Sequence, residues 1–170
     1  QVMTAEVTGE VLVNFRLDAV DSLGNALTEV TVGDEFILRG YVQDLRETPQ
    51  GVAAGYLDAV IENQLVSITG SITFGDLYQN APSGDLSQAG LIDEVGAMSG
   101  LSASDGDEKV LFSVPMRANL AGTEVFSSNA ADVLPQHDTL LYGSNDPVST
   151  ANIAYQSKSL TVNVGFTVES

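Results

Sequence analysis

The sequence contains no cysteine, which excludes disulfide bonds, thiolate metal sites and cysteine nucleophiles. It contains no tryptophan and a single histidine, His137. The chain also lacks the nucleophile-elbow serine and the glycine-rich phosphate loop that accompany common enzyme chemistry. These absences predict a binding or structural protein rather than an enzyme.

Basic residues are also scarce. The chain has six Lys and Arg against 23 Asp and Glu, so its formal net charge is −17 at pH 7. A surface with this imbalance repels the phosphates of nucleic acids and anionic lipids, so we expect neither as a partner. An acidic surface keeps a protein in solution and suits a secreted protein. We therefore expect an extracellular or cell-surface location.

Long hydrophobic runs are missing as well. No apolar stretch approaches the ~18 residues that a membrane-spanning helix needs, so we expect no membrane insertion. Hydrophobic residues nevertheless make up 44% of the chain, which is enough for a packed core. A length of 170 residues suits one domain, and no linker divides the sequence. We predict a single domain over residues 1–170.

The chain does contain short β-prone runs, separated by turn signals roughly every ten to twelve residues. Apolar and polar residues alternate within these runs, as at Val13, Phe15 and Leu17. The pattern predicts an all-β fold, a single antiparallel β-sandwich, jelly-roll-like, of about nine strands. The residues expected in its core are Val13, Phe15, Phe36, Leu38, Val42, Leu57, Val66, Ile68, Val110, Phe112, Val114, Phe126, Leu160 and Val162.

Glycine and proline refine this prediction at several points. Gly40 interrupts an alternating strand, which predicts a bulge or a close packing contact there. Pro115 lies in another strand, which indicates an edge strand or a bulge. Residues 75–90 are rich in turn-forming residues and are predicted to form a loop. Residues 91–98 are ambiguous between a strand and a helical turn, although Gly96 disfavours a helix.

Short motifs over residues 11–164 follow one another in a recognisable order. They are Val32-Gly33-Asp34, Gly51-Val52-Ala53, Tyr56-Leu57-Asp58, Leu65-Val66-Ser67, Gly90 to Gly96, Asp107 to Phe112 and Ala121-Gly122-Thr123. In this order they resemble the cohesin-like β-sandwich modules of large secreted bacterial proteins of the planctomycete type. The resemblance implies a sandwich that binds a dockerin partner through one sheet face, and related folds bind carbohydrate. It concerns packing positions and carries no catalytic signature.

One loop offers a candidate metal site. Asp105, Asp107 and Glu108 are three carboxylates in a glycine-containing segment. Hard oxygen ligands of this kind suit calcium, although the spacing is not that of a complete EF-hand. We predict a calcium site here, with a solvated acidic turn as the alternative.

Two constellations raise the question of catalysis. Asp93–Glu94 could pair across strands with Asp58 or Asp76, and two carboxylates at the right separation hydrolyse glycosides. His137–Asp138 is a His–carboxylate pair, but no activated serine accompanies it. Carboxylates on an exposed sheet face and a polar histidine in a loop account for both without catalysis, so we expect no enzyme activity.

Five tyrosines allow an alternative function as a carbohydrate-binding module, because a row of aromatic rings on one face can stack on sugars. Tyrosine is equally suited to covering a sheet face, and tryptophan, the favoured stacking residue, is absent. The tyrosines are Tyr41, Tyr56, Tyr78, Tyr142 and Tyr155.

The two ends of the chain, residues 1–9 and 165–170, are β-prone and largely uncharged. One of them could add as a strand to a neighbouring molecule, or each could extend its own sheet. The residues expected to make the contact between molecules are Val2, Ala5, Val7, Phe166 and Val168.

The predicted function is a secreted, non-catalytic structural or adhesive module that contacts other copies of itself or a protein partner. Strand addition of a head-to-tail kind would produce a self-assembling filament or surface-layer subunit. The alternatives are a carbohydrate-binding module and a cohesin-type partner-binding module of a larger scaffold.

Overall fold

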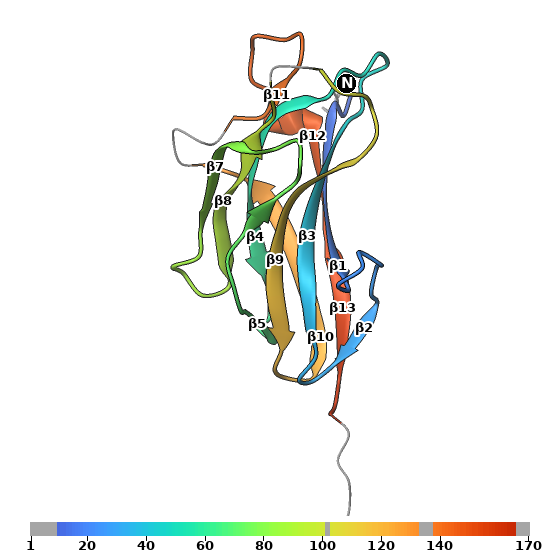
Figure 1. Ribbon diagram of the computed structural model, residues 1–170, viewed down its shortest axis with the longest axis vertical. Coiled ribbons are helices and arrows are strands. Elements are labelled where there is room, and N and C mark those ends of the chain that lie inside the picture. The colour runs from blue at the N-terminus through green and yellow to red at the C-terminus, as the bar shows by residue number, and fades with distance from the viewer. Residues whose placement is uncertain (1–9, 101–102, 133–137, 166–170) are drawn as a thin grey trace, which may run out of the picture.

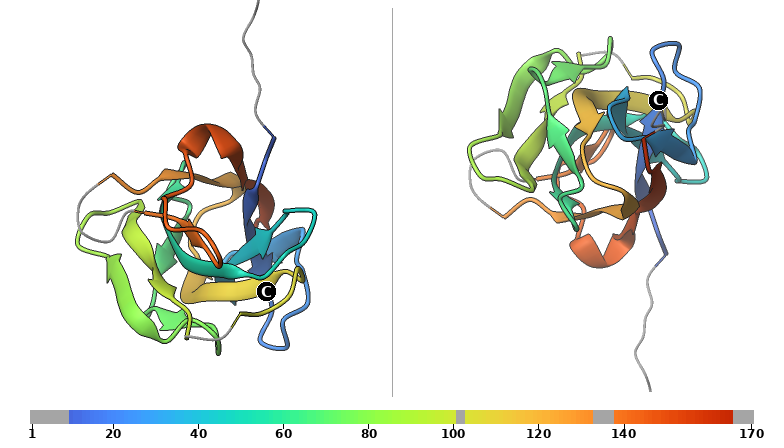
Figure 2. Two further views of the ribbon diagram at one scale, coloured as in Figure 1. Left: turned by 90° about the horizontal axis from the view of Figure 1, so that it is seen from above. Right: turned by 90° about the horizontal axis from the view of Figure 1, so that it is seen from below.

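The computed structural model describes residues 10–100, 103–132 and 138–165, which form two β-sheets packed face to face (Figure 1). The all-β prediction is confirmed, and the one helical element among these residues is a 3₁₀ turn at Thr150–Asn152. Viewed along the long axis, the sheets curve around a shared core (Figure 2). No helix in the described ranges is long and apolar enough to cross a membrane.

The first sheet, sheet A, has six strands. They are β1 (Val13–Val20), β3 (Glu35–Asp44), β5 (Val66–Ile68), β6 (Thr73–Phe74), β9 (Lys109–Ala118) and β12 (Ile153–Gln156). Their order across the sheet is β12-β1-β3-β9-β5, with β6 also paired to β9.

The second sheet, sheet B, has seven strands. They are β2 (Glu29–Thr31), β4 (Val52–Ile61), β7 (Asn80–Asp85), β8 (Leu91–Met98), β10 (Gly122–Ala130), β11 (Leu140–Leu141) and β13 (Lys158–Asn163). Their order is β2-β13-β10-β4-β8-β7, with β11 paired to β4.

Most neighbouring strands are antiparallel, as predicted, but β12 runs parallel to β1 and β2 runs parallel to β13. β12 and β13 follow one another in the chain, so the C-terminal segment crosses from sheet A to sheet B at Ser157. Beside this crossing, Lys158 Nζ lies 2.9 Å from Asp18 Oδ1 on β1. The last two strands therefore link β12, at the edge of sheet A, to β13, which lies between β2 and β10 in sheet B.

The predicted core residues are all buried except Ile68 and Val110, which are half-buried. Val110 leaves the core because the pairing of β3 with β9 shifts register after Gly40, which leaves Leu111 as an extra residue on β9. A bulge of this kind reverses which residues face inward. Leu111 enters the core in place of Val110 and is fully buried.

Both interpretations of Gly40 are confirmed. The residue lies at this bulge, and a Cβ atom on it would lie 2.1 Å from Cε1 of the buried Phe112 ring. The interpretation of Pro115 is wrong, because β9 is an interior strand and Pro115 pairs regularly with Ile37. The missing N–H is tolerated because the opposite neighbour is interrupted between β5 and β6, where Gly70 passes close to the proline ring.

Residues 75–90 are not one loop, because they contain β7, which pairs with β8. The pattern missed β7 because its side chains are exposed and show no apolar alternation. Its pairing is irregular, with Ala81 at a φ of 46° and Pro82 beside it. Residues 91–98 form strand β8, which resolves their ambiguity. Short strands such as β2, β5, β6 and β11 bring the total to thirteen instead of about nine.

Gly40→Ala tests the close contact at the β3–β9 bulge. We expect it to lower the free energy of unfolding by about 1–3 kcal/mol, because the added methyl group overlaps the Phe112 ring in a packed core. Urea denaturation monitored by circular dichroism measures the change. Gly100→Ala is the control, since a Cβ atom there meets nothing within 4 Å. Equal stability of the two variants would contradict the packing described.

Candidate functional site

The six basic residues of the chain are unevenly distributed over the molecule. All of them lie on sheet A, directly after its strand β3, or in contact with its strand β1. They are Arg16, Arg39, Arg46, Lys109, Arg117 and Lys158.

Arg16 and Lys158 are compensated by carboxylates nearby. Arg16 lies over the ring of Tyr41, 4.3 Å from its centroid, and contacts Glu108 and Asp18, each at 2.8 Å. Lys158 contacts the other oxygen of Asp18 at 2.9 Å. Burial of Asp18 opposes its ionisation, but the hydrogen bonds from Lys158 and Arg16 outweigh this effect and lower the pKa of its carboxyl group. The centre of this face is therefore an ion-pair network with its charges satisfied.

The loop predicted to bind calcium lies at the edge of the same network. Asp105 Oδ1 is 2.6 Å from Lys109 Nζ and also accepts the backbone N–H of Asp107. Glu108 is held by the guanidinium of Arg16. A calcium ion would have to displace both cations to gather these carboxylates. The calcium site in this loop stays a prediction.

A different group of carboxylates comes together on sheet B. Oxygen atoms of Asp58, Asp93, Glu94 and Asp132 all lie within 4.8 Å of one another. The first three meet at a bulge between β4 and β8, where Asp93 and Glu94 on β8 together face Asp58 on β4. Glu94 has a φ of 52°, and its N–H donates to Asp58 Oδ1 at 2.8 Å. We call these four residues the acidic cluster.

The sequence predicted part of this cluster. The pairing of Asp93–Glu94 with Asp58 is the one that the structure forms, while Asp76 is not part of the group. Asp132 was missed because it lies beyond the end of β10 and follows no strand pattern. It joins the cluster through its backbone N–H, which donates to Glu94 Oε2 at 3.0 Å.

The acidic cluster is electrostatically strained. Asp58 and Glu94 are only 7% and 8% exposed. Burial, reinforced by the carboxyl groups of Glu94 and Asp93, raises the pKa of Asp58 to about 7. The four carboxyl groups, whose oxygen atoms lie within 4.8 Å of one another, repel one another when they are ionised. This part of sheet B therefore favours binding of a proton or of a positive group.

An apolar strip lies on the same outer face as the acidic cluster. Val60 on β4 pairs with Leu91 on β8. On its other side Val60 pairs with Ser127 on β10, and Val125 lies two residues before Ser127 on the same face of that strand. Val60, Leu91 and Val125 alternate with buried core residues, so their side chains point outward, and each is half-buried. We call the outer face of sheet B that carries this strip and the acidic cluster the B face.

The chemistry of the cluster differs from that of a glycosidase. The two carboxyl groups of such an enzyme stand about 5 Å or more apart, so that the sugar and water fit between them. Asp58 and Glu94 are instead buried against each other and joined by a backbone hydrogen bond. Four carboxylates within 4.8 Å are a donor set that a hard cation such as calcium accepts, so these are the residues that could hold a metal ion.

The tyrosines do not form a platform. None of the five is exposed, and they come from separate parts of both sheets. Tyr78 is buried and donates to the carbonyl of Val52, and Tyr56 donates to the carbonyl of Ala81. Tyr155 stacks on the core ring of Phe15. The exposed row that would favour sugar binding is therefore not present.

Several predicted positions lie outside the described residues. They are His137 and the proposed assembly residues Val2, Ala5, Val7, Phe166 and Val168.

No family model and no curated protein matches the sequence. Solved structures do match. The chain is similar to the seventh ScaB type I cohesin from Pseudobacteroides cellulosolvens, at 14% identity and a TM-score of 0.62, over 94% of this chain and 97% of that one. It is similar to a non-cellulosomal cohesin from the archaeon Archaeoglobus fulgidus, at 13% identity and a TM-score of 0.58, over 88% and 91% of the two chains.

A third similar structure is a type I cohesin–dockerin complex from Clostridium thermocellum, at 12% identity and a TM-score of 0.57, covering 88% of this chain and 99% of that one. Together these similarities show that the chain has a cohesin-like fold, which confirms the fold implied by the motif order. The planctomycete-type origin and secretion stay predictions.

Asp58→Asn tests the strain in the acidic cluster. Because the folded protein holds the Asp58 proton more tightly than the unfolded chain, this group lowers stability as pH rises from about 4 to about 7. Asparagine keeps the acceptor for the Glu94 N–H and removes the charge. We expect the variant to exceed the wild type by about 1–3 kcal/mol at pH 8 and to match it near pH 4.

Urea denaturation across this pH range gives the comparison. Asp76→Asn is the control, because Asp76 is exposed and lies outside the cluster. The account would be contradicted if the free energy of unfolding of Asp58→Asn and that of the wild type changed with pH in the same way. Asp58 would then be an ordinary ionised carboxylate.

Proposed function

We propose that this chain is a non-catalytic protein–protein interaction module that binds its partner through the B face. The observation that carries the proposal is the crowding of carboxyl groups in the acidic cluster. Oxygen atoms of its four carboxyl groups lie within 4.8 Å of one another, and burial together with the carboxyl groups of Glu94 and Asp93 raises the pKa of Asp58 to about 7. A partner that places Lys or Arg over the cluster gains charge-assisted hydrogen bonds and relieves its strain.

The rest of the B face supports the same proposal. The apolar strip of Val60, Leu91 and Val125 provides a surface that a partner can cover, and the carboxylates beside it fix the orientation. The similar structure from Clostridium thermocellum is a cohesin in complex with a dockerin, which supports a protein partner for this fold. The partner class we propose is a dockerin-type module with basic residues, bound outside the cell.

Val60→Arg and Leu91→Arg test the B face. We expect each to weaken partner binding by about tenfold or more, because a long charged side chain replaces an apolar contact at the centre of the interface. Isothermal titration calorimetry against purified dockerin modules from the same genome measures the dissociation constants. Ile37→Arg is the matched control, because Ile37 is a half-buried aliphatic residue on the outer face of sheet A.

The outcomes of this experiment distinguish an error in the proposed binding face from an error in the proposed partner class. Loss of binding in Ile37→Arg but not in Val60→Arg would place the interface on sheet A. A chain that binds no dockerin module at all would contradict the proposed partner class.

A second candidate function is self-assembly into a filament or surface layer by strand addition. It is favoured by the open edges of both sheets, with β6 and β7 on one side of the sandwich and β12 and β2 on the other. An exposed edge offers unpaired backbone groups to a strand from another molecule. Residues 1–9 and 165–170 are the donor strands in this proposal.

A further inference from the structure

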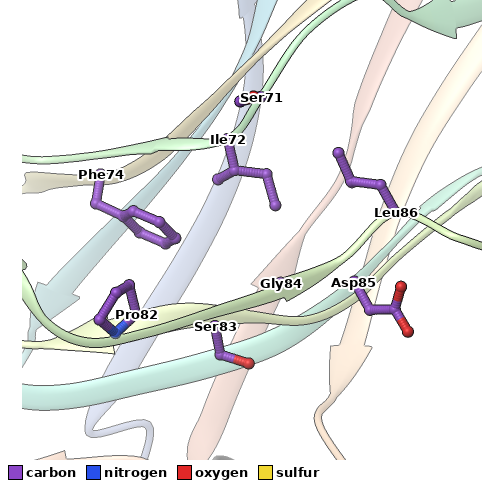
Figure 3. A pocket seen from close by; sticks show the side chains of 8 residues that line it. All are labelled: Ser71, Ile72, Phe74, Pro82, Ser83, Gly84, Asp85 and Leu86. Carbon is purple, nitrogen blue, oxygen red and sulfur yellow. The ribbon is translucent and has the colours of Figure 1, made fainter.

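One side of the sandwich is open between two strand edges. β6 ends sheet A there and β7 ends sheet B, and a hollow of about 480 Å³ lies between them. Figure 3 shows that Ile72, Phe74, Pro82 and Leu86 point into this space, while the carboxylate of Asp85 points away. We call this apolar hollow the β6–β7 groove.

The groove continues along the same side of the molecule. A second hollow of about 300 Å³ shares Leu86 with the first, and its lining combines apolar side chains such as Ile61 and Ile68 with polar ones such as Gln64 and Asn119. The combined surface is long and carries both apolar and polar side chains, which suits an extended amphipathic segment better than a compact ligand.

The edge of β7 is available for pairing. Among the described residues, Asn80–Asp85 make no backbone-to-backbone hydrogen bond apart from those with β8. Pro82 has no N–H and cannot donate a backbone hydrogen bond. An added strand would therefore pair with the residues that follow it, Ser83–Asp85. The side chain of Ser83 points away from the groove (Figure 3).

The N-terminal segment of the chain has the composition of a strand that fits this groove. Met3, Ala5 and Val7 alternate with Thr4, Glu6 and Thr8, so over residues 3–8 an extended segment has one apolar and one polar face, and Val2 lies on the side of Thr4. It contains one carboxylate in a chain whose net charge is −17, so the segment itself adds little repulsion to its contact with a second acidic copy. Residues 2–8 are thus suited to cover Ile72, Phe74 and Leu86.

The segment reaches the groove of another copy more readily than its own. Residues 10–12 are held at the opposite side of the sandwich from β7 (Figure 2). There the Leu12 N–H donates to the Asn152 carbonyl at 2.8 Å, and Asn152 Nδ2 donates to the Glu10 carbonyl at 2.9 Å. A donor on one side and an acceptor on the other form a head-to-tail contact that propagates.

The geometry points to the β6–β7 groove as the acceptor for residues 2–8 of a second copy, which add as a strand along β7 with Met3, Ala5 and Val7 against the groove. The inference rests on the proposed self-assembly and names the two surfaces that make it. The polar face of the donor then lies on the same side as Ser83.

Cysteine cross-linking tests this contact, and the absence of native cysteine keeps the background low. Full-length Thr4→Cys is mixed with full-length Ser83→Cys under mild oxidation, and covalent dimers are counted on a non-reducing gel. We expect several-fold more mixed dimer than in a control mixture with Ser22→Cys, an exposed position in another loop. Sedimentation of the full chain and of Ile72→Lys, over a concentration series, provides a second measurement.

Ile72→Lys is expected to weaken association by about tenfold or more, because it buries an ammonium group under the donor. Ile37→Lys, half-buried on sheet A, is the matched control, and circular dichroism verifies that both variants are folded. Concentration-dependent association without Thr4–Ser83 cross-linking and without an effect of Ile72→Lys overturns the groove as acceptor but not self-assembly. A monomer at every concentration, with no cross-linking, overturns both.

Discussion

Six basic side chains cannot compensate 23 carboxyl groups, and their placement decides what each face of the sandwich can do. The structure concentrates them around sheet A, where Arg16 and Lys158 share Asp18. Lys158 lies where the chain crosses from β12 to β13, so the same network helps to hold β13 of sheet B against β1 of sheet A. On sheet B, four carboxyl groups lie close together, and burial raises the pKa of Asp58 to about 7. The basic partner proposed for the B face would relieve this crowding of like charges.

Two breaks in strand register shape the molecule further. The shift between β3 and β9 turns Leu111 into the core, and Gly40 leaves the space that Phe112 occupies. The shift between β4 and β8 places two carboxylates opposite Asp58. In each case one extra residue changes which side chains share a face, so a local irregularity determines packing in one sheet and chemistry in the other.

The sequence predicts most of this fold because a strand with one buried face alternates visibly, as β1 and β3 do. It could not predict β7, whose exposed side chains leave no pattern. The acidic cluster was predicted only where its residues were adjacent or lay in a recognised strand, and Asp132 follows from tertiary structure alone. The loop at Asp105 shows the opposite case, because its carboxylates can be recognised in the sequence. The sequence does not reveal that Arg16 binds Glu108 and competes with calcium, because the two residues are 92 positions apart.

The B face and the β6–β7 groove are made by different residues, so partner binding and self-assembly do not exclude one another. The central claim concerns the B face, and backbone amide NMR during titration with a bound dockerin-type module tests it most directly. The account predicts the largest chemical-shift changes on β4, β8 and β10, centred on Val60 and the acidic cluster. Changes concentrated on β1, β3 and β9 of sheet A instead would contradict it.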